Sequence, residues 1–279
     1  MMENKKIRSA TAVDDFYPSQ KKSLKDVIKK LIRKASSPYF VGEIFGLLLP
    51  HAAYYLSGEV AGEGFKHLQG KKFETVIILA DSHYEYFDGV SIWSAGCWET
   101  PLGQIKIDED LANKICFFSK RFKPTESAHL FDHTIEVQLP FLQQTIGSFK
   151  LVPILIGSED KDWRQLAKAI SNNIKGKKLL IIVSSDLSHY PLKKEAEKLD
   201  KNTLGAILSL DTDILEKQLK KAINPRVESL LCSRDAVKVL MEVAKNLQGK
   251  AKLLKYKNVG GVFGKKEKVV GYGSVAFFR

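Results

Sequence analysis

The chain has 279 residues, of which 44% are hydrophobic and 27% are charged. These fractions are typical of a soluble globular protein, and a chain of this length buries a sizeable core without disulfide bonds. No apolar run approaches the ~20 residues that a membrane-spanning helix needs, and the first residues, MMENKKIRSATAVDD, lack the apolar segment of a secretory signal. We therefore expect one cytoplasmic domain over residues 1–279, with no membrane as a partner.

The net charge of +12 comes mostly from lysine, in runs such as KKSLKDVIKK and FGKKEK. Acidic residues are mixed with these lysines, arginine is scarce, and no zinc-finger, helix-turn-helix or RNP pattern accompanies them. The charge therefore indicates solvated helix faces and no nucleic-acid partner, whereas acidic small molecules or proteins stay open as partners. The three cysteines, Cys97, Cys116 and Cys232, are too few for a disulfide framework and indicate free thiols.

Short apolar runs alternate along the chain with segments of helical periodicity. Four runs predict buried strands over residues 43–50, 75–80, 150–157 and 178–185. Amphipathic spacing predicts helices over residues 24–35, 57–68 (with Ser57 as cap), 108–122, 134–147 (with a kink at Pro140), 162–176, 192–210 and 233–247. Residues 251–258 and 268–278 predict a closing pair of strands joined by a glycine turn. This alternation favours a single α/β domain with a mainly parallel or mixed central sheet flanked by helices.

Three of the six histidines closely follow predicted buried strands: His51, His83 and His189. A lone histidine at a strand end is more often a structural hydrogen-bonding group than a ligand. In open α/β sheets, however, ligands gather beyond the carboxyl ends of the strands, so three such histidines predict a shared polar site. Two histidines and one anionic group with open positions are typical of non-haem iron(II) and catalytic zinc sites. The anionic candidates are Asp81, Asp186, Glu136 and Cys232.

Several of these side chains have more than one interpretation. Cys232 stands at the start of an expected helix, where the helix dipole and a nearby metal lower the pKa of a thiol and so favour a thiolate ligand. The alternative interpretation is that Cys232 is a small buried hydrophobic residue. Asp186 and His189 are three residues apart, which suits a helical turn that directs both side chains into the site. Asp186 is then either a metal ligand or the partner of a protonated histidine, and His189 is a general acid or base. His133 and Glu136 share a helix face, where Glu136 either orients a histidine ligand or belongs to a solvated first turn.

Nine sequence motifs follow one another along nearly the whole chain. They are DDFYPSQKKSLKDVI (14–28), LLPHAAYYLSGEVAG (48–62), ILADSHYEYFDGVSIW (78–93), WETPLGQIKID (98–108), DHTIEVQLPFLQ (132–143), VPILIG (152–157), SSDLSHY (184–190), CSRDAV (232–237) and VGYGSVAFF (270–278). Together these motifs resemble the Memo family, whose microbial members are called AmmeMemoRadiSam system protein B. The number and order of the motifs argue against chance similarity.

The resemblance implies a fold similar to that of class III extradiol ring-cleaving dioxygenases. It implies a mononuclear metal held by two histidines and a cysteine, which match His51, His83 and Cys232. It also implies Asp186 and His189 as the catalytic acid/base pair.

The remaining matched residues are expected to orient a metal ligand or to contact the substrate. They are His133, Glu136 and Asp81. The chain departs from the family motifs at Ala53 (PHAAY for PHAGY), at Ala80 and Asp81 (ADSH for GPSH) and at Ser233 (CSR for CGR). Because every implied ligand is retained, these changes bear on loop shape and substrate fit more than on metal binding.

Two functions of different classes follow from the resemblance. The first is a dioxygenase-like, metal-dependent oxidoreductase that uses iron(II), with zinc or copper as other ions, on an unknown small molecule. The second is a binding module that recognises a peptide or partner and acts with an Ammecr-domain protein and a radical SAM enzyme. A third and weaker one is hydrolysis by a zinc-bound water. Because a cysteine stands where ring-cleaving dioxygenases have a carboxylate ligand, we expect oxygen uptake with catechols to be weak or absent.

Overall fold

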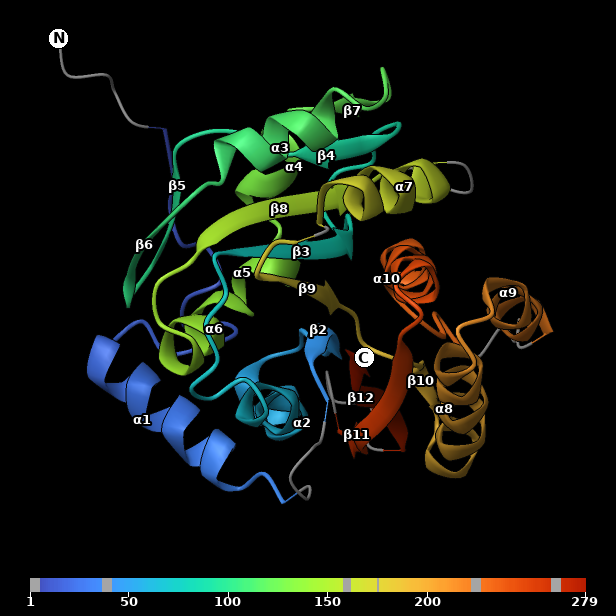
Figure 1. Cartoon of the computed structure of the whole chain (residues 1–279). Coiled ribbons are helices and arrows are strands. Elements are labelled where there is room, and N and C mark those ends of the chain that lie inside the picture. Colours follow the sequence, from blue (N-terminus) through green and yellow to red (C-terminus); the bar gives the residue numbers. More distant parts are fainter. Residues whose placement is uncertain (1–5, 37–41, 158–161, 175, 222–226, 262–266) are drawn as a thin grey trace, which may run out of the picture.

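A nine-stranded mixed sheet forms the centre of the molecule, and its four middle strands are parallel (Figure 1). In spatial order they are β2 (Ile44–Leu49), β9 (Leu179–Ser184), β3 (Thr75–Asp81) and β8 (Lys150–Ile156). They confirm the four predicted strands. Their side chains are buried almost throughout because elements cover both faces, which is why they read as continuous apolar runs. The computed structural model describes residues 6–36, 42–157, 162–174, 176–221, 227–261 and 267–279.

Antiparallel strands flank this parallel centre. The predicted closing pair is present as β11 (Lys250–Gly260) and β12 (Lys268–Phe278), and β12 also pairs with β2 and with β10 (His189–Leu192). The glycine turn predicted between β11 and β12 lies largely outside the described residues. At the other edge, β4 (Val90–Ile92) pairs with β8, and β7 (Phe122–Lys123) pairs with β4. No pattern in the sequence predicted β4, β7 or β10, because strands of two to four residues are too short to show periodicity.

Helices cover the two faces of the sheet (Figure 1). On one side, α2 (Tyr54–Lys66) packs on β2 and β12, and α1 (Lys21–Arg33) and α6 (Leu139–Thr145) lie against α2. On the other side, α10 (Arg234–Asn246) packs on β3 and β9, next to α7 (Asp162–Ile174). The remaining helices are α3 (Glu109–Cys116), α4 (Ser127–Leu130), α5 (His133–Glu136), α8 (Lys193–Leu208) and α9 (Thr212–Lys221). None of the described helices combines the length and apolarity needed to cross a bilayer.

Some of the predicted helix limits are wrong. The helix expected to start after Ser57 begins at Tyr54, and Ser57 lies inside it, where its hydroxyl donates to the Ala52 carbonyl. The helix expected over residues 134–147 is split into α5 and α6, with Pro140 in the first turn of α6. The helix expected to reach residue 122 ends at Cys116. Apolar periodicity shows that a segment is helical, but it locates the ends of a helix only to within a few residues.

A small sheet packs beside α5 and brings the N-terminal segment to the core. It consists of β1 (Ile7–Arg8), β5 (Cys97–Thr100) and β6 (Gly103–Lys106). Arg8 is 1% exposed and forms an ion pair with Glu136, which is fully buried. The Arg8 guanidinium also lies 4.3 Å from the centre of the Trp98 ring. A buried charge needs such partners, because taking it out of water is costly.

The Glu136 carboxylate gathers the N-terminal segment around itself. It accepts hydrogen bonds from the amides of Thr11 and Ala12 and from the Tyr17 hydroxyl. Burial alone raises the pKa of the Glu136 carboxyl, but the Arg8 charge and these hydrogen bonds hold it below its usual value of 4.5. Glu136 is therefore an anchor for residues 8–17.

We expect Glu136→Gln to lower the free energy of unfolding at pH 7 by about 3–5 kcal/mol, because it leaves the Arg8 charge buried and unpaired. A carboxylate whose pKa is lower in the folded state contributes stability above its unfolded pKa and loses it as the pH falls. The difference between wild type and variant should thus shrink below pH 4.5 in urea titrations. Asp110→Asn, in the exposed pair with Lys114, should stay close to wild type throughout. A constant difference at all pH values would contradict the anchor.

Candidate metal centre

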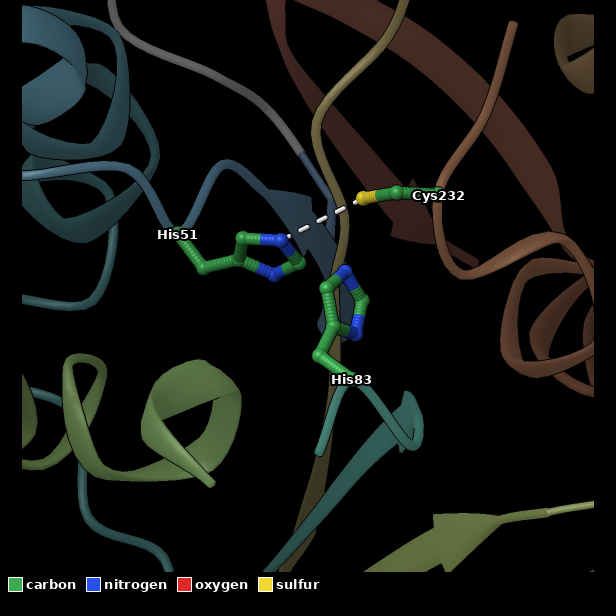
Figure 2. A group of neighbouring side chains, drawn as sticks. All are labelled: His51, His83 and Cys232. Atoms are coloured by element: carbon green, nitrogen blue, oxygen red, sulfur yellow. Dashed lines mark hydrogen bonds between the residues drawn. The ribbon is translucent and has the colours of Figure 1, made fainter. Parts of the chain in front are cut away.

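Three potential ligands from three separate parts of the chain meet beyond the carboxyl ends of the central strands. His51 follows β2, His83 follows β3, and Cys232 lies in the segment that leads into α10. One ligand atom from each side chain lies within 4.8 Å of the other two. The Cys232 Sγ is 3.2 Å from His51 Nε2. Figure 2 shows the two imidazole rings and the sulfur atom turned toward one another.

This donor set fits a single metal ion. Bonds of about 2.0–2.3 Å to nitrogen and sulfur place the ligands of a tetrahedral ion roughly 3–4 Å apart. The spacing between His51 and Cys232 is already in this range, and small side-chain movements bring the whole set into it. His51 is buried, Cys232 is half-buried and His83 is exposed, so the centre opens to solvent on the His83 side.

The hydrogen bonds of His51 hold it in the form that binds metal. The Ser184 hydroxyl donates to the Thr134 carbonyl at 2.6 Å, which leaves its oxygen to accept from the His51 Nδ1–H, 3.3 Å away. The His51 Nε2 lone pair therefore faces Cys232. The Gln138 amide supports Ser184 by donating to its oxygen at 2.7 Å. Burial and the charges of the neighbouring histidines lower the pKa of His51 well below 6.5, so the imidazole is neutral.

His83 has the same tautomer for a similar reason. Its Nδ1 lies 2.8 Å from the main-chain carbonyl of Asp81, which only accepts, so Nδ1 carries the proton and Nε2 is free for a metal. The main-chain amide of His83 donates to the Asp132 carboxylate at 2.9 Å. Asp132 also caps α5 through the Thr134 amide, so one carboxylate ties the His83 loop to this helix.

Cys232 is held by the main chain of the segment that follows β9. The Asp186 amide donates to the Cys232 Sγ at 3.1 Å, and the Cys232 amide donates to the Asp186 carbonyl at 3.3 Å. Burial, together with the nearby charge of Asp186, raises the pKa of the thiol. This is opposite to the lowering expected from the start of α10 alone, because desolvation outweighs the helix dipole here.

Asp186 and His189 lie beside the three ligands without belonging to the cluster of mutually close ligand atoms. Asp186 is buried, and its carboxylate accepts from the His51 amide at 2.9 Å. Its other oxygen is 4.0 Å from the Nε2 atoms of both His51 and His189. The Nδ1–H of His189 donates to the Leu187 carbonyl at 2.9 Å, which leaves Nε2 free to exchange protons. The helical turn predicted for Asp186 and His189 is wrong: residues 185–188 form neither helix nor strand, and His189 starts β10.

His133 joins the same group of rings. Its centroid is 5.4 Å from that of His51 and 5.9 Å from that of His83, and Phe16 stacks on its other face at 4.1 Å. Burial lowers the pKa of His133 to about 4, and its buried Nδ1 has no hydrogen-bond partner among the described residues. His133 thus lies beside the ligand histidines, and its contact with a substrate stays a prediction. Glu136 bonds instead to the N-terminal segment, and none of its described hydrogen bonds reaches a ligand histidine.

Asp81 reaches the other side of the centre. Its carboxylate accepts hydrogen bonds at 3.0 Å from the amides of Asp235 and Ala236, in the first turn of α10. Removal from water, together with the charge of Asp235, raises the pKa of the Asp81 carboxyl to about 7.

Three residues near the centre were missed by the sequence analysis. Asp132 and Gln138 hold ligands in place, as described above. Tyr272 is fully buried on β12, its hydroxyl has no hydrogen-bond partner among the described residues, and burial and the charge of Asp186 raise its pKa. In the sequence, the only local indication of this residue is the pair of glycines on either side of it, because a glycine within a strand often marks a close approach of another element.

We expect Ser184→Ala to weaken metal binding about 10–100-fold, because the hydrogen bond that orients His51 is lost. The measurement is a Co²⁺ titration followed by absorption. The control is Ser91→Ala, since the Ser91 hydroxyl bonds to His129 Nε2 at 2.9 Å in an equally buried pair that lies outside the cluster. Equal loss in both variants would show that general stability, not ligand orientation, decides the affinity.

Metal affinity should also rise with pH. Because the surroundings raise the pKa of the Cys232 thiol, the sulfur must release a proton when it binds an ion. One released proton corresponds to about a tenfold gain in affinity per pH unit, measurable by competition with a chelator between about pH 7 and 9. Cys116→Ser should keep this slope and Cys232→Ser should flatten it; an affinity independent of pH in the wild type would contradict the ligand assignment.

Comparison with known proteins identifies one family along nearly the whole chain. A family model described as Memo-like protein matches residues 8–276. A MEMO1 family protein of Desulfurococcus amylolyticus is 35% identical over 286 residues, covering 98% of this chain and 99% of the relative. MEMO1 family proteins of Nitrosopumilus maritimus and Thermoplasma volcanium are 32% and 31% identical, each over at least 97% of this chain and 99% of the relative. With a match along nearly its whole length, the chain belongs to the Memo family.

Proposed function

We propose that this chain is a metal-dependent oxidoreductase that holds one iron(II) ion through His51, His83 and Cys232. The observation that supports this proposal most is that the side chains of His51, His83 and Cys232 converge. A further histidine and a carboxylate, His189 and Asp186, lie beside them and are not needed as ligands. Iron with two imidazoles and one anionic ligand keeps coordination positions open and supplies redox chemistry with dioxygen. Zinc and copper are the other ions that this donor set accepts.

His189 is the proposed acid/base group. Its Nδ1–H is committed to the Leu187 carbonyl, so Nε2 takes up a proton from a bound substrate and returns it. The Asp186 carboxylate, 4.0 Å from this nitrogen, stabilises the imidazolium that forms. The His51 amide holds that carboxylate in position. The acid/base pair and the metal centre are thus built on one hydrogen-bonded frame.

A binding module is the second candidate, and the exposed aromatic side chains near the centre favour it. Tyr84, 61% exposed, lies 6.0 Å from the His133 ring, and Tyr86 in the same loop is 88% exposed. Exposed aromatic side chains are typical of surfaces that bind another molecule. In this case the partner is a peptide, an Ammecr-domain protein or a radical SAM protein. The relationship in fold to class III extradiol dioxygenases and the cytoplasmic location stay predictions of the sequence analysis.

Elemental analysis of anaerobically purified protein separates these candidates. We expect about one iron per chain in the wild type and in Cys116→Ser, and loss of iron in His51→Ala and Cys232→Ser, because each of the last two removes a ligand. His189→Ala should keep the iron, since His189 is not a ligand.

The other outcomes each have a meaning. Wild-type protein without any metal would contradict the proposed oxidoreductase function and favour the binding module. Zinc in place of iron would favour hydrolysis. With iron present, oxygen uptake with catechols tests ring cleavage, and we expect it to be weak or absent because Cys232 takes the place of a carboxylate ligand.

A further inference from the structure

Asp81 contacts the surroundings of two metal ligands at once. Its main-chain carbonyl accepts from the His83 ring at 2.8 Å and thereby sets the orientation of that imidazole. Its side chain accepts from the amides of Asp235 and Ala236, at 3.0 Å each. Those amides belong to the first turn of α10, which begins two residues after Cys232. One residue therefore joins the support of His83 to the support of Cys232.

The start of α10 has no side-chain cap of its own. Ser233 occupies the cap position but makes no capping hydrogen bond, and its buried hydroxyl has no partner among the described residues. The first amides of a helix need acceptors, and a carboxylate there is also favoured by the helix dipole. Asp81 supplies both oxygens from the end of β3. The cap of α10 thus comes from the strand that carries His83.

Burying a carboxylate at this place is costly, and the charge of the neighbouring Asp235 adds to the cost. Asp235 forms an ion pair with the buried Lys238, which also lies 2.6 Å from Glu216 of α9. The two main-chain hydrogen bonds and the charge of Arg234 favour the charged form of Asp81 and offset part of the cost. A local serine or threonine cap would avoid the desolvation of Asp81. Such a cap would not link α10 to the end of β3.

The His83 loop has other supports, but apart from those of Asp81 none of the described hydrogen bonds of this loop ties it to the start of α10. His83 is exposed, and the residues between β3 and β4 form no helix or strand. The Ser82 amide donates to the Ile156 carbonyl at 2.8 Å, and Asp132 holds the His83 amide and connects the loop to α5. Metal–ligand distances are tolerated only within about 0.2 Å, so a shift of this loop relative to Cys232 weakens binding.

We propose that Asp81 is a positioning residue that fixes the distance between His83 and Cys232 by fastening the end of β3 to the first turn of α10. The proposal rests on the metal site proposed above. Asp81 touches neither the ion nor the substrate; it acts through the two ligands on either side of it.

The test compares Co²⁺ binding by wild type, Asp81→Ala and Asp81→Asn, followed by the thiolate-to-cobalt absorption band. We expect the dissociation constant of Asp81→Ala to rise about 10–100-fold, with a changed band, because the sulfur and His83 no longer meet the ion together. Asp81→Asn keeps one oxygen acceptor and should fall in between. If Asp81→Ala does not fold by circular dichroism, Asp81→Asn carries the same comparison.

Asp108→Ala is the matched control. The Asp108 side chain caps α3 and accepts from the Thr75 hydroxyl, so it joins a helix start to the opposite end of the same strand, β3. This variant should keep the wild-type cobalt affinity and band. Wild-type affinity and an unchanged band in both Asp81 variants, or equal weakening by Asp108→Ala, would overturn the positioning role alone. A wild-type protein that binds no Co²⁺ would overturn the metal site, and the positioning role with it.

Discussion

The parallel order of β2, β9 and β3 is the constraint on which the centre depends. Neighbouring strands lie about 4.8 Å apart, so the ends of β2 and β3 are separated by roughly 9.5 Å with β9 between them. Two imidazoles that extend inward from His51 and His83 close that distance. The segment after β9 runs through the gap and supplies Asp186, whose main chain pairs with Cys232.

Main-chain carbonyls and one hydroxyl then decide the chemistry of each histidine. His51, His83 and His189 all use Nδ1 for a hydrogen bond to an oxygen atom, which leaves Nε2 as the nitrogen available to a metal or a proton. A neutral imidazole with a free Nε2 is the form that binds a metal or accepts a proton. Because the acceptors belong to strand ends and to the residues next to them, the sheet fixes the tautomers as well as the positions.

Buried and half-buried carboxylates connect the loops around this frame. Glu136 anchors residues 8–17 and so brings Phe16 onto the face of His133. Asp132 joins the His83 loop to α5, and Asp81 joins the end of β3 to α10. Each of these carboxylates accepts hydrogen bonds from main-chain amides, and these bonds compensate for its removal from water. The loops carry little regular structure, so these links stand in for it.

The sequence by itself determined the four central strands, most of the helices, the closing strand pair and the placement of His51 and His83 after strands. Long apolar runs and amphipathic spacing indicate which side chains are buried, and many residues of a segment contribute to each such pattern, so it can be recognised in the sequence. The family resemblance selected Cys232 among the four anionic candidates, because a single position has no periodicity that would distinguish it. The partners of Glu136, the direction of the thiol pKa shift, the irregular segment before His189 and the hydrogen bonds of Asp81, Asp132 and Gln138 were decided only by the tertiary structure. The hydrogen bonds among these features join residues about 50 to 150 positions apart, and no local pattern in the chain encodes such a pair.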